Sequence, residues 1–136
     1  MIIEESIEIN STPRHIFSIY KNVSNWHVWD KEVKESSLKG SFIKGSSGSL
    51  TPSKGPKSKI ELSEVEEDKS FTVESKLPFC VMHFEHNLIS KGDTVLVTHR
   101  VRFKGLLSFV FRNIIGKKIK NGFPITLKGL KSLAEK

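Results

Sequence analysis

Two long runs of alternating hydrophobic residues, joined by a short turn, constrain the fold of this chain more than any other feature. One face of the first run holds Cys80, Met82, Phe84, His86 and Leu88, and one face of the second holds Val95, Val97, His99, Val101 and Phe103. Alternation with a period of two is typical of a strand with one buried face. The "SKGD" between the runs is a hairpin signal. The pattern therefore predicts an antiparallel hairpin with one histidine per strand on its interior face.

A change of period after Gly105 predicts a long helix at the end of the chain. Hydrophobic residues then recur at spacings of three and four, as in an amphipathic helix. The stripe consists of Leu107, Phe111, Ile115, Ile119, Phe123, Leu127, Leu130 and Ala134. We expect Phe109 and Phe111 to pack near the helix start. Pro124 lacks an amide hydrogen and clashes with the preceding turn, so a kink is expected near Gly122.

The rest of the chain completes an α+β pattern, which we expect to form one domain over residues 1–136. Alternation over residues 3–9 predicts a strand. Thr12 is a favoured helix cap, and Pro13 fits the first helical position. The "SNWHVWD" segment predicts a second short helix or turn, and turn residues divide residues 31–103 into strands. The expected order is one strand, two short helices, six strands and the long helix.

The composition is that of a soluble globular protein in a reducing compartment. Hydrophobic residues make up 37% of the 136 residues and charged residues 27%, which are ordinary values. The single cysteine, Cys80, excludes an internal disulfide framework. The opening "MIIEESIEIN" carries acids where a secretory signal would carry positive charge, and no hydrophobic run reaches membrane-spanning length. We expect a cytoplasmic protein.

The net charge of +7 lies in the last quarter of the chain, because the residues before Lys104 contain 14 basic and 14 acidic side chains. A basic segment can meet an anionic membrane or a nucleic acid, or it can form the solvated face of a helix. Solvation is the preferred interpretation, since few aromatic residues are interleaved with the basic ones. We predict no nucleic-acid partner, and weak contact with a membrane surface stays open as an alternative.

Five segments, together with the element order, indicate a known family. The segments are "STPRHIFSIYKNVSNWHVWD", "SSLKGSFIKGSSGSLTP", "VMHFEHNL", "VTHRVRFKG" and "IIGKKIKNGFPITLKGL". With them the chain resembles the START-like helix-grip superfamily, including SRPBCC proteins and bacterial proteins of polyketide cyclase/dehydrase type. The resemblance implies a seven-stranded curved antiparallel sheet (β-α-α-β6-α) wrapped around the C-terminal helix, with a ligand cavity between them. Members bind lipids, hormones or polyketides and only some are enzymes, so the fold does not determine the function.

His86 and His99 are the most distinctive polar residues on the predicted interior faces. If Lys91 pairs with Thr94 across the turn, His86 directly opposes His99, whereas a register shifted by two makes them diagonal neighbours. Two neutral imidazoles could share a hydrogen bond, orient a ligand carbonyl, or act as acid and base. A pair of core histidines with satisfied hydrogen bonds is an equally good interpretation.

The sequence offers no recognisable metal site or catalytic motif. A zinc site at His86 and His99 would need a third ligand. His83 points to the opposite face, and Cys80 lies about 20 Å from His86 along the strand. The chain contains no nucleophile elbow, phosphate-binding glycine loop or paired in-phase carboxylates. We therefore predict neither a metal nor a cofactor.

The preferred hypothesis is a protein that binds a small hydrophobic, lipid- or polyketide-like ligand between the sheet and the long helix. The predicted ligand-binding residues are Trp26, Trp29, Phe71, Ser75, Met82, Phe84, His86, His99, Val101, Phe103, Phe111 and Ile115. For the two tryptophans, plain core packing is the stronger interpretation. Two alternatives stay open: a cyclase/dehydrase-type enzyme with His86 or His99 as acid or base, and a peripheral lipid-binding protein.

An entrance to the cavity is predicted where the loops "TPSKGPKS", "KLPF" and "FKGLL" meet at one end of the sheet. In an antiparallel meander, successive turns alternate between the two ends, so these three share an end and "SKGD" lies at the other. The predicted mouth consists of Lys54, Lys76, Leu77, Phe79, Lys104 and Leu106. Its lysines would favour a ligand with an anionic head group.

Overall fold

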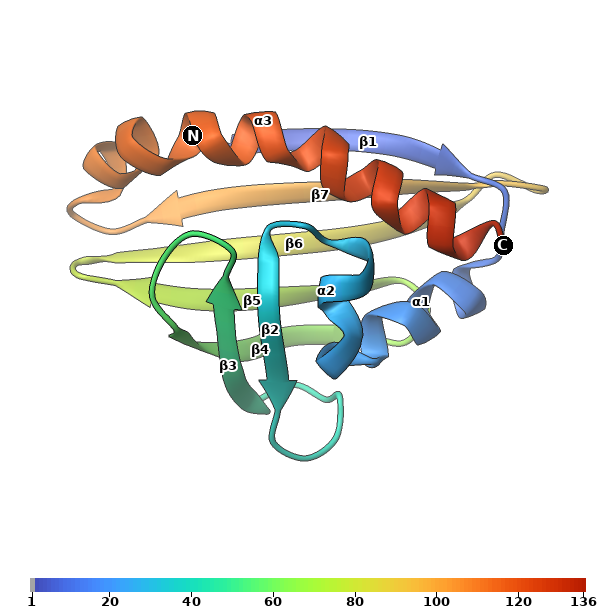
Figure 1. Cartoon of the computed structure of the whole chain (residues 1–136), viewed down its shortest axis with the longest axis horizontal. Helices are drawn as coiled ribbons and strands as arrows, with labels where there is room; N and C mark the ends of the chain where they lie inside the picture. The colour runs from blue at the N-terminus through green and yellow to red at the C-terminus, as the bar shows by residue number, and fades with distance from the viewer. Residues whose placement is uncertain (1) are drawn as a thin grey trace.

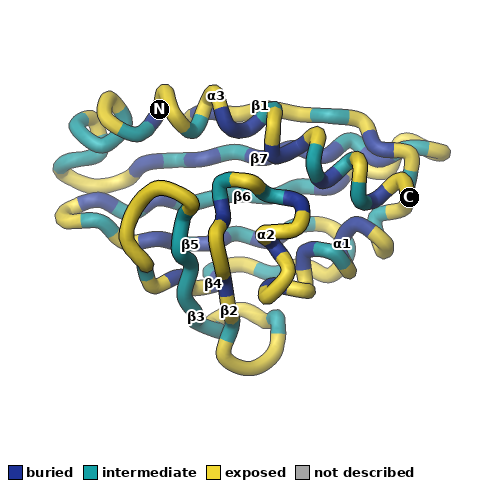
Figure 2. Tube along the Cα trace, in the orientation of Figure 1, coloured by how far each residue is buried: buried dark blue, intermediate teal, exposed yellow. Residues whose placement is uncertain are grey.

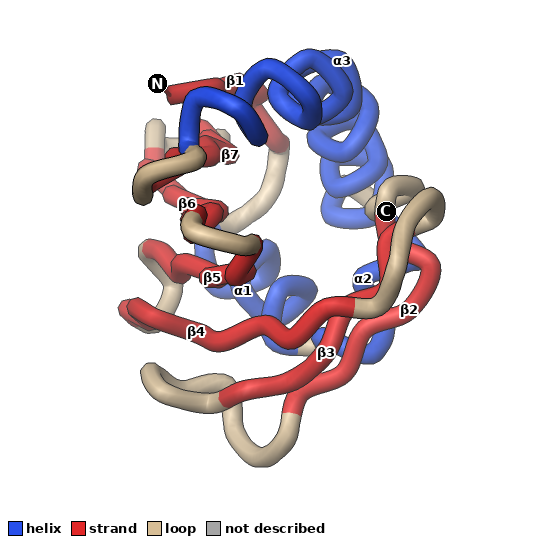
Figure 3. Tube along the Cα trace, turned by 90° about the vertical axis from the view of Figure 1, so that its left-hand side faces the viewer, coloured by secondary structure: helices blue, strands red, loops and turns tan. Residues whose placement is uncertain are grey.

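The computed structural model describes residues 2–136, and within them a seven-stranded antiparallel sheet curves around one long helix (Figures 1 and 3). The strands are β1 (Ile2–Ile9), β2 (Val33–Leu38), β3 (Ser47–Pro52), β4 (Ser58–Glu66), β5 (Ser70–Leu77), β6 (Cys80–Ser90) and β7 (Val95–Lys104). The helices are α1 (Pro13–Lys21), the single turn η1 (Val23–Asn25), α2 (Trp26–Trp29) and α3 (Ser108–Ala134). The spatial order β1-β7-β6-β5-β4-β3-β2 makes β1 and β2 the two edges. The predicted element order and fold class are confirmed.

The hairpin of β6 and β7 has the first of the two registers that the sequence left open. The amide of Lys91 donates to the carbonyl of Thr94 at 2.8 Å, and His86 pairs directly with His99. Because side chains alternate between the two faces of a strand, both rings lie on the concave side of the sheet. His83 lies on the convex side, with its Nδ1 3.4 Å from a carboxylate oxygen of Glu74.

The helices begin as their sequences predict. The side chain of Thr12 accepts a hydrogen bond from the amide of His15 at 3.1 Å, which satisfies an amide that the first turn leaves free. The long helix α3 runs from Ser108 to Ala134 without interruption, and Pro124 lies inside it. The ribbon of α3 changes direction along its length in Figure 1, so a bend accompanies the proline without breaking the helix.

The buried residues form two distinct hydrophobic clusters within the described chain (Figure 2). The main cluster includes Ile16, Phe17, Tyr20, Trp26, Trp29, Phe71, Val97, Leu127 and Leu130 and joins α1, α2 and the C-terminal half of α3 to the sheet. The end cluster consists of Ile3, Cys80, Met82, Val101, Phe103 and Phe123. The C-terminal half of α3 is thus the better buried half.

The N-terminal half of α3 packs less closely than its hydrophobic stripe predicted. Its stripe residues Phe111, Ile115 and Ile119 are only partly buried. The expectation that Phe109 packs at the helix start is wrong, because its side chain is 56% exposed. Phe109 lies two positions before Phe111, which packs against the end cluster, and residues two apart in a helix point to different sides.

The predicted grouping of loops is confirmed. The β3–β4, β5–β6 and β7–α3 connections lie at one end of the sheet, and the β6–β7 hairpin lies at the other (Figure 1). The amide of Leu107 donates to the carbonyl of Phe79 at 3.1 Å, which joins two of these loops. Gly105 has a φ of +120°, and a Cβ there would lie 2.5 Å from the same carbonyl oxygen, so the junction requires glycine.

Replacing Gly129 with Ala tests how α3 is held against α2. An ideal Cβ at Gly129 would lie 2.1 Å from the carbonyl oxygen of Trp29. Alanine favours a helix over glycine by about 1 kcal/mol, but overpacking typically costs about 1–3 kcal/mol. We expect Gly129→Ala to lower the free energy of unfolding, as measured by urea denaturation.

The matched control is Lys128→Ala, an exposed neighbour on the same helix, which should leave the free energy of unfolding nearly unchanged. A Gly129→Ala protein as stable as the wild type would show that α3 does not depend on this close contact.

Candidate functional site

A buried group of aromatic and histidine rings lies on the concave face, near the hairpin end of the sheet. The rings of His86 and His99 are 4.6 Å apart between centroids. His86 stacks on Phe71 of β5, with centroids 3.9 Å apart and an interplanar angle of 3°. The hydroxyl of Tyr20, supplied by α1, lies 2.8 Å from Nε2 of His99. Three strands and a helix therefore converge on the two histidines.

Burial keeps both imidazoles neutral. It lowers the pKa of His86 to about 4, and it lowers the pKa of His99 well below its usual range, with the neighbouring His86 adding to the effect. Nδ1 of His86 lies 3.2 Å from the carbonyl oxygen of Phe71. A carbonyl only accepts, so Nδ1 carries the proton and Nε2 is left as an acceptor. Burial also raises the pKa of Tyr20, whose hydroxyl stays protonated.

The indole Nε1 of Trp29, beside the rings of Tyr20 and His99, is a hydrogen-bond donor without a partner in the described residues. Its ring lies 5.8 Å from that of Tyr20 and 6.3 Å from that of His99. Its side chain is only 5% exposed, yet its Nε1 has no hydrogen-bond partner within residues 2–136. Trp26 differs, because its Nε1 donates to the carbonyl of Tyr20 at 2.8 Å. Buried donors are nearly always satisfied, so Trp29 identifies a position where an acceptor would be stabilised.

Asp30 fixes the turn after α2 through two hydrogen bonds. One carboxylate oxygen accepts from the amide of Glu32 and from the hydroxyl of Thr126, each at 3.0 Å. Burial is the main cause of the raised pKa of Asp30, and the two hydrogen bonds oppose it. The contact with Thr126 ties α3 to the segment that carries Trp29.

The predicted ligand-binding residues fall into two groups. Eight of them are buried: Trp26, Trp29, Phe71, Ser75, Met82, His99, Val101 and Phe103. Four keep accessible surface, namely Phe84, His86, Phe111 and Ile115. Phe84 packs against both the main cluster and the end cluster. These four residues come from β6 and from the N-terminal half of α3.

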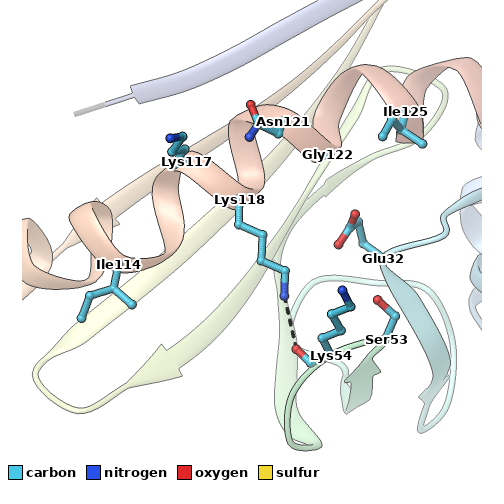
Figure 4. A pocket seen from close by; sticks show the side chains of 9 residues that line it. All are labelled: Glu32, Ser53, Lys54, Ile114, Lys117, Lys118, Asn121, Gly122 and Ile125. Carbon is cyan, nitrogen blue, oxygen red and sulfur yellow. Dashed lines mark hydrogen bonds between the residues drawn. The ribbon is translucent and has the colours of Figure 1, made fainter.

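A cleft of about 530 Å³ opens beside α3 on the side of β2 and β3 (Figure 4). It is lined by Glu32, Ser53, Lys54, Ile114, Lys117, Lys118, Asn121, Gly122 and Ile125. Nζ of Lys118 donates to the carbonyl of Lys54 at 3.3 Å, which links α3 to the β3–β4 loop across the cleft. Gly122 precedes Phe123, whose ring lies 6.2 Å from that of His99. The same turn of α3 therefore lines the cleft through Gly122 and lies near the histidine group through Phe123.

A second cleft of about 340 Å³ lies at the end of the sheet where the loops meet. It is lined by Lys76, Leu77, Phe79, Cys80, Val81, Lys104, Gly105 and Leu106. Five of the six predicted mouth residues line this cleft, and the sixth, Lys54, lines the larger one. None of the twelve predicted ligand-binding residues lines either cleft, so their role stays a prediction.

Sequence reasoning missed Tyr20 as a member of the site. Its position beside Ile16 and Phe17 predicted only the hydrophobic side of a short helix. The available signal was its hydroxyl, because a buried tyrosine hydroxyl usually needs a hydrogen-bond partner. No residue pattern in the sequence predicted the cleft at Glu32 and Gly122, because this cleft depends on the distance between a helix and a loop.

Residues 2–136 contain neither a metal-binding cluster nor a membrane-spanning helix. No group of three or more His, Cys, Asp or Glu side chains is placed to hold a metal ion. No helix in this part of the chain is long and hydrophobic enough to cross a membrane.

The family follows from a match that spans the fold. The model of the family described as polyketide cyclase/dehydrase and lipid transport matches residues 1–135. The chain belongs to this family. The predicted resemblance to SRPBCC and START-like proteins is thereby confirmed, while no curated protein matches the sequence.

Solved structures show the same fold at low sequence identity. A hypothetical protein of Helicobacter pylori has a TM-score of 0.79 at 11% identity, over 98% of this chain and 88% of that one. Norcoclaurine synthase of Thalictrum flavum, in complex with a transition-state analogue, has a TM-score of 0.75 at 12% identity, over 98% and 93%. The Aha1 dimer of Colwellia psychrerythraea has a TM-score of 0.74 at 13% identity, over 99% and 96%. Such different proteins share the fold alone.

The neutral histidines predict that stability falls on acidification. Both imidazoles have a lower pKa in the folded chain than in the unfolded one, so the unfolded state binds more protons below about pH 6.5. The contribution of His86 is fully present above about 6.5 and is lost as the pH falls to about 4. We expect the free energy of unfolding to decrease across this range, by up to about 1.4 kcal/mol per pH unit for each histidine.

The His86→Phe variant isolates this effect from that of other groups. Asp30 acts in the opposite direction, because its pKa is raised in the folded chain, and it is unchanged in the variant. Unfolding by urea at several pH values should give a smaller decrease for His86→Phe than for the wild type. Equal decreases for the two proteins would mean that His86 is not held neutral by the fold.

Proposed function

We propose that this protein binds a small, largely hydrophobic ligand between the concave face of the sheet and the N-terminal half of α3. The ligand would lie between the main cluster and the end cluster, in contact with Phe84, His86 and Ile115. Its class would be lipid- or polyketide-like, as the description of the family suggests.

The division of the core into two clusters carries this proposal. A domain usually has one contiguous core with smaller satellite clusters, and close packing leaves few gaps larger than a water molecule. Here Phe84 and His86 on the concave face of β6 are only partly buried, and Phe84 packs against both clusters. On the N-terminal half of α3, Ile115 and Ile119 are also only partly buried. A hydrophobic ligand in this position would complete the packing of both sides.

The polar groups at the deep end would orient the ligand. Nε2 of His86 is a free acceptor if Nδ1 donates to Phe71, and Nε1 of Trp29 is an unpartnered donor. Together they match a ligand hydroxyl, which can donate to Nε2 of His86 and accept from Nε1 of Trp29. Few polar groups in a hydrophobic pocket are the usual basis of specificity for small molecules.

The cleft beside α3 supports an entrance for ligands with an anionic head group. Lys54, Lys117 and Lys118 line it against one acid, Glu32. At the loop end, Lys76 and Lys104 line the second cleft. An anionic group would be stabilised by these lysines at either opening.

Binding is favoured over catalysis by the titration of the histidines. A general acid or base works best when its pKa lies near the working pH. The pKa of His86 is lowered to about 4 and that of His99 also lies well below its usual range. Neutral imidazoles of this kind are better suited to hydrogen bonding than to proton transfer, so the cyclase/dehydrase-type enzyme ranks second.

Displacement of a fluorescent fatty acid from three variants tests the proposed site. His86→Phe and Trp29→Phe each remove one polar group offered to a hydroxyl at the deep end of the site, so each should weaken binding of an ω-hydroxy fatty acid, measured by displacement of the probe, by roughly 1–3 kcal/mol, the typical effect of one unsatisfied buried group. Trp26→Phe is the matched control. It removes a hydrogen bond to Tyr20, so it should lower the melting temperature while leaving the affinity for the ω-hydroxy fatty acid unchanged.

The same assay compares a fatty acid with its methyl ester, which lacks the negative charge. We expect the acid to displace the probe more effectively, because the lysines of the two openings attract its carboxylate. Unchanged affinity in both His86→Phe and Trp29→Phe would show that the histidine group is structural and that the ligand, if any, binds elsewhere.

A further inference from the structure

Four large hydrophobic side chains are exposed at the loop end of the molecule. Leu106 is 81% exposed, Phe79 74%, Ile114 70% and Phe109 56%. They belong to the β5–β6 turn, the β7–α3 junction and the first two turns of α3. Single exposed hydrophobic residues are normal, whereas several at one end indicate an interaction site.

The β5–β6 turn and the β7–α3 junction lie next to one another, so their exposed hydrophobic side chains belong to one surface. The amide of Leu107 donates to the carbonyl of Phe79 at 3.1 Å, and Phe79 and Leu106 line the same cleft. Phe109 follows Leu106 by three residues at the start of α3. We call Phe79, Leu106, Phe109 and Ile114 the apolar tip.

The backbone at Phe79 presents its ring to solvent at an energetic cost. Its φ is +54°, a conformation that is unusual for a bulky residue. Glycine or asparagine would fit this turn with less strain. A strained turn that exposes an aromatic ring is more often found at functional positions than at neutral ones.

Positive charge surrounds the apolar tip. The three segments 52–60, 76–84 and 104–121 contain nine lysine or arginine residues and no aspartate or glutamate. Apart from the partly buried Arg112, these basic residues are exposed: Lys54, Lys57, Lys59, Lys76, Lys104, Lys117, Lys118 and Lys120. Acidic residues flank these segments at Glu61, Glu74 and Glu85, and Glu32 lines the larger cleft beside Lys54.

We propose that the loop end docks on a membrane surface that contains anionic lipids. The side chains of the apolar tip enter the interface between head groups and acyl chains, and the surrounding lysines contact the anionic head groups. Hydrophobic insertion combined with a basic rim is the arrangement that binds peripheral proteins to membranes. Docking would place the opening at Lys76 and Lys104 against the lipid.

Charge and shape favour a membrane over the other candidate partners. A second copy would bring the same basic rim against itself, and the repulsion would oppose association. A nucleic acid would satisfy the lysines but would leave the aliphatic side chains of Leu106 and Ile114 without a partner. Only an anionic lipid surface is complementary to both features.

Membrane docking is separate from ligand binding, because the apolar tip does not include the histidine group. Docking does not require a bound ligand. A chain that binds no fatty acid could still dock, and a chain that binds a fatty acid could fail to dock. The two proposals therefore fail separately.

Flotation of the protein with vesicles tests the docking surface. The wild type should bind phosphatidylcholine vesicles that contain phosphatidylglycerol and bind pure phosphatidylcholine weakly. Raising the ionic strength from about 0.1 M to about 1 M should weaken binding, because the screening length falls from about 10 Å to about 3 Å. The double variant Phe79→Asn/Leu106→Ser should lose at least about ten-fold in vesicle partitioning, and Lys76→Gln/Lys104→Gln about five-fold per lysine.

Two control variants carry comparable substitutions away from the apolar tip. Ile43→Ser removes a side chain that is 59% exposed in the β2–β3 connection, and Lys91→Gln removes a charge at the opposite end of the sheet. Both should bind vesicles as the wild type does. Equal binding to both kinds of vesicle, or equal losses in the control variants, would overturn the proposal. So would a wild-type dimer that Phe79→Asn/Leu106→Ser converts to a monomer, or DNA binding that competes with the vesicles and is insensitive to that variant.

Discussion

The direct opposition of two histidines in the β6–β7 hairpin is the constraint on which the interior of this protein depends. Two imidazoles whose rings are 4.6 Å apart in a buried position cannot both carry charge. They must be neutral and must find partners, because buried polar groups without hydrogen bonds are costly. Helix α1 supplies the hydroxyl of Tyr20, and β5 supplies the carbonyl of Phe71. The hydrogen bond of Tyr20 therefore adds to the burial of Ile16 and Phe17 in holding α1 over the sheet.

The same constraint separates the two ends of the molecule. Around the histidines, α1, α2 and the C-terminal half of α3 pack closely, as the contact of Gly129 with Trp29 illustrates. Toward the loop end, the N-terminal half of α3 keeps partly exposed residues. One end therefore holds a buried group of histidine and aromatic rings, while the other exposes hydrophobic and basic side chains. This polarity fits a protein that takes up an amphipathic molecule at the open end and holds its far end at the histidines.

Much of this arrangement could be predicted from local patterns. Alternation predicted the strands, Thr12 and Pro13 predicted the start of α1, and the "SKGD" turn predicted a hairpin in which His86 and His99 are either directly opposed or diagonal neighbours. These features depend on residues close together in the chain or across one turn. The contact of Tyr20 with His99 joins residues 79 positions apart and depends on how α1 crosses the sheet. The expectation for Phe109 failed for a local reason, because residues two apart in a helix point to different sides and Phe111 takes the packed one.

The central claim is that the space between the main cluster and the end cluster holds the ligand. A crystal structure of the protein saturated with an ω-hydroxy fatty acid tests it most directly. The account predicts electron density for the acyl chain beside Phe84 and Ile115, with a polar end within hydrogen-bonding distance of His86 or Trp29. Acyl density confined to the outer cleft at Lys54 and Lys118, with side chains filling the space beneath α3, would contradict it.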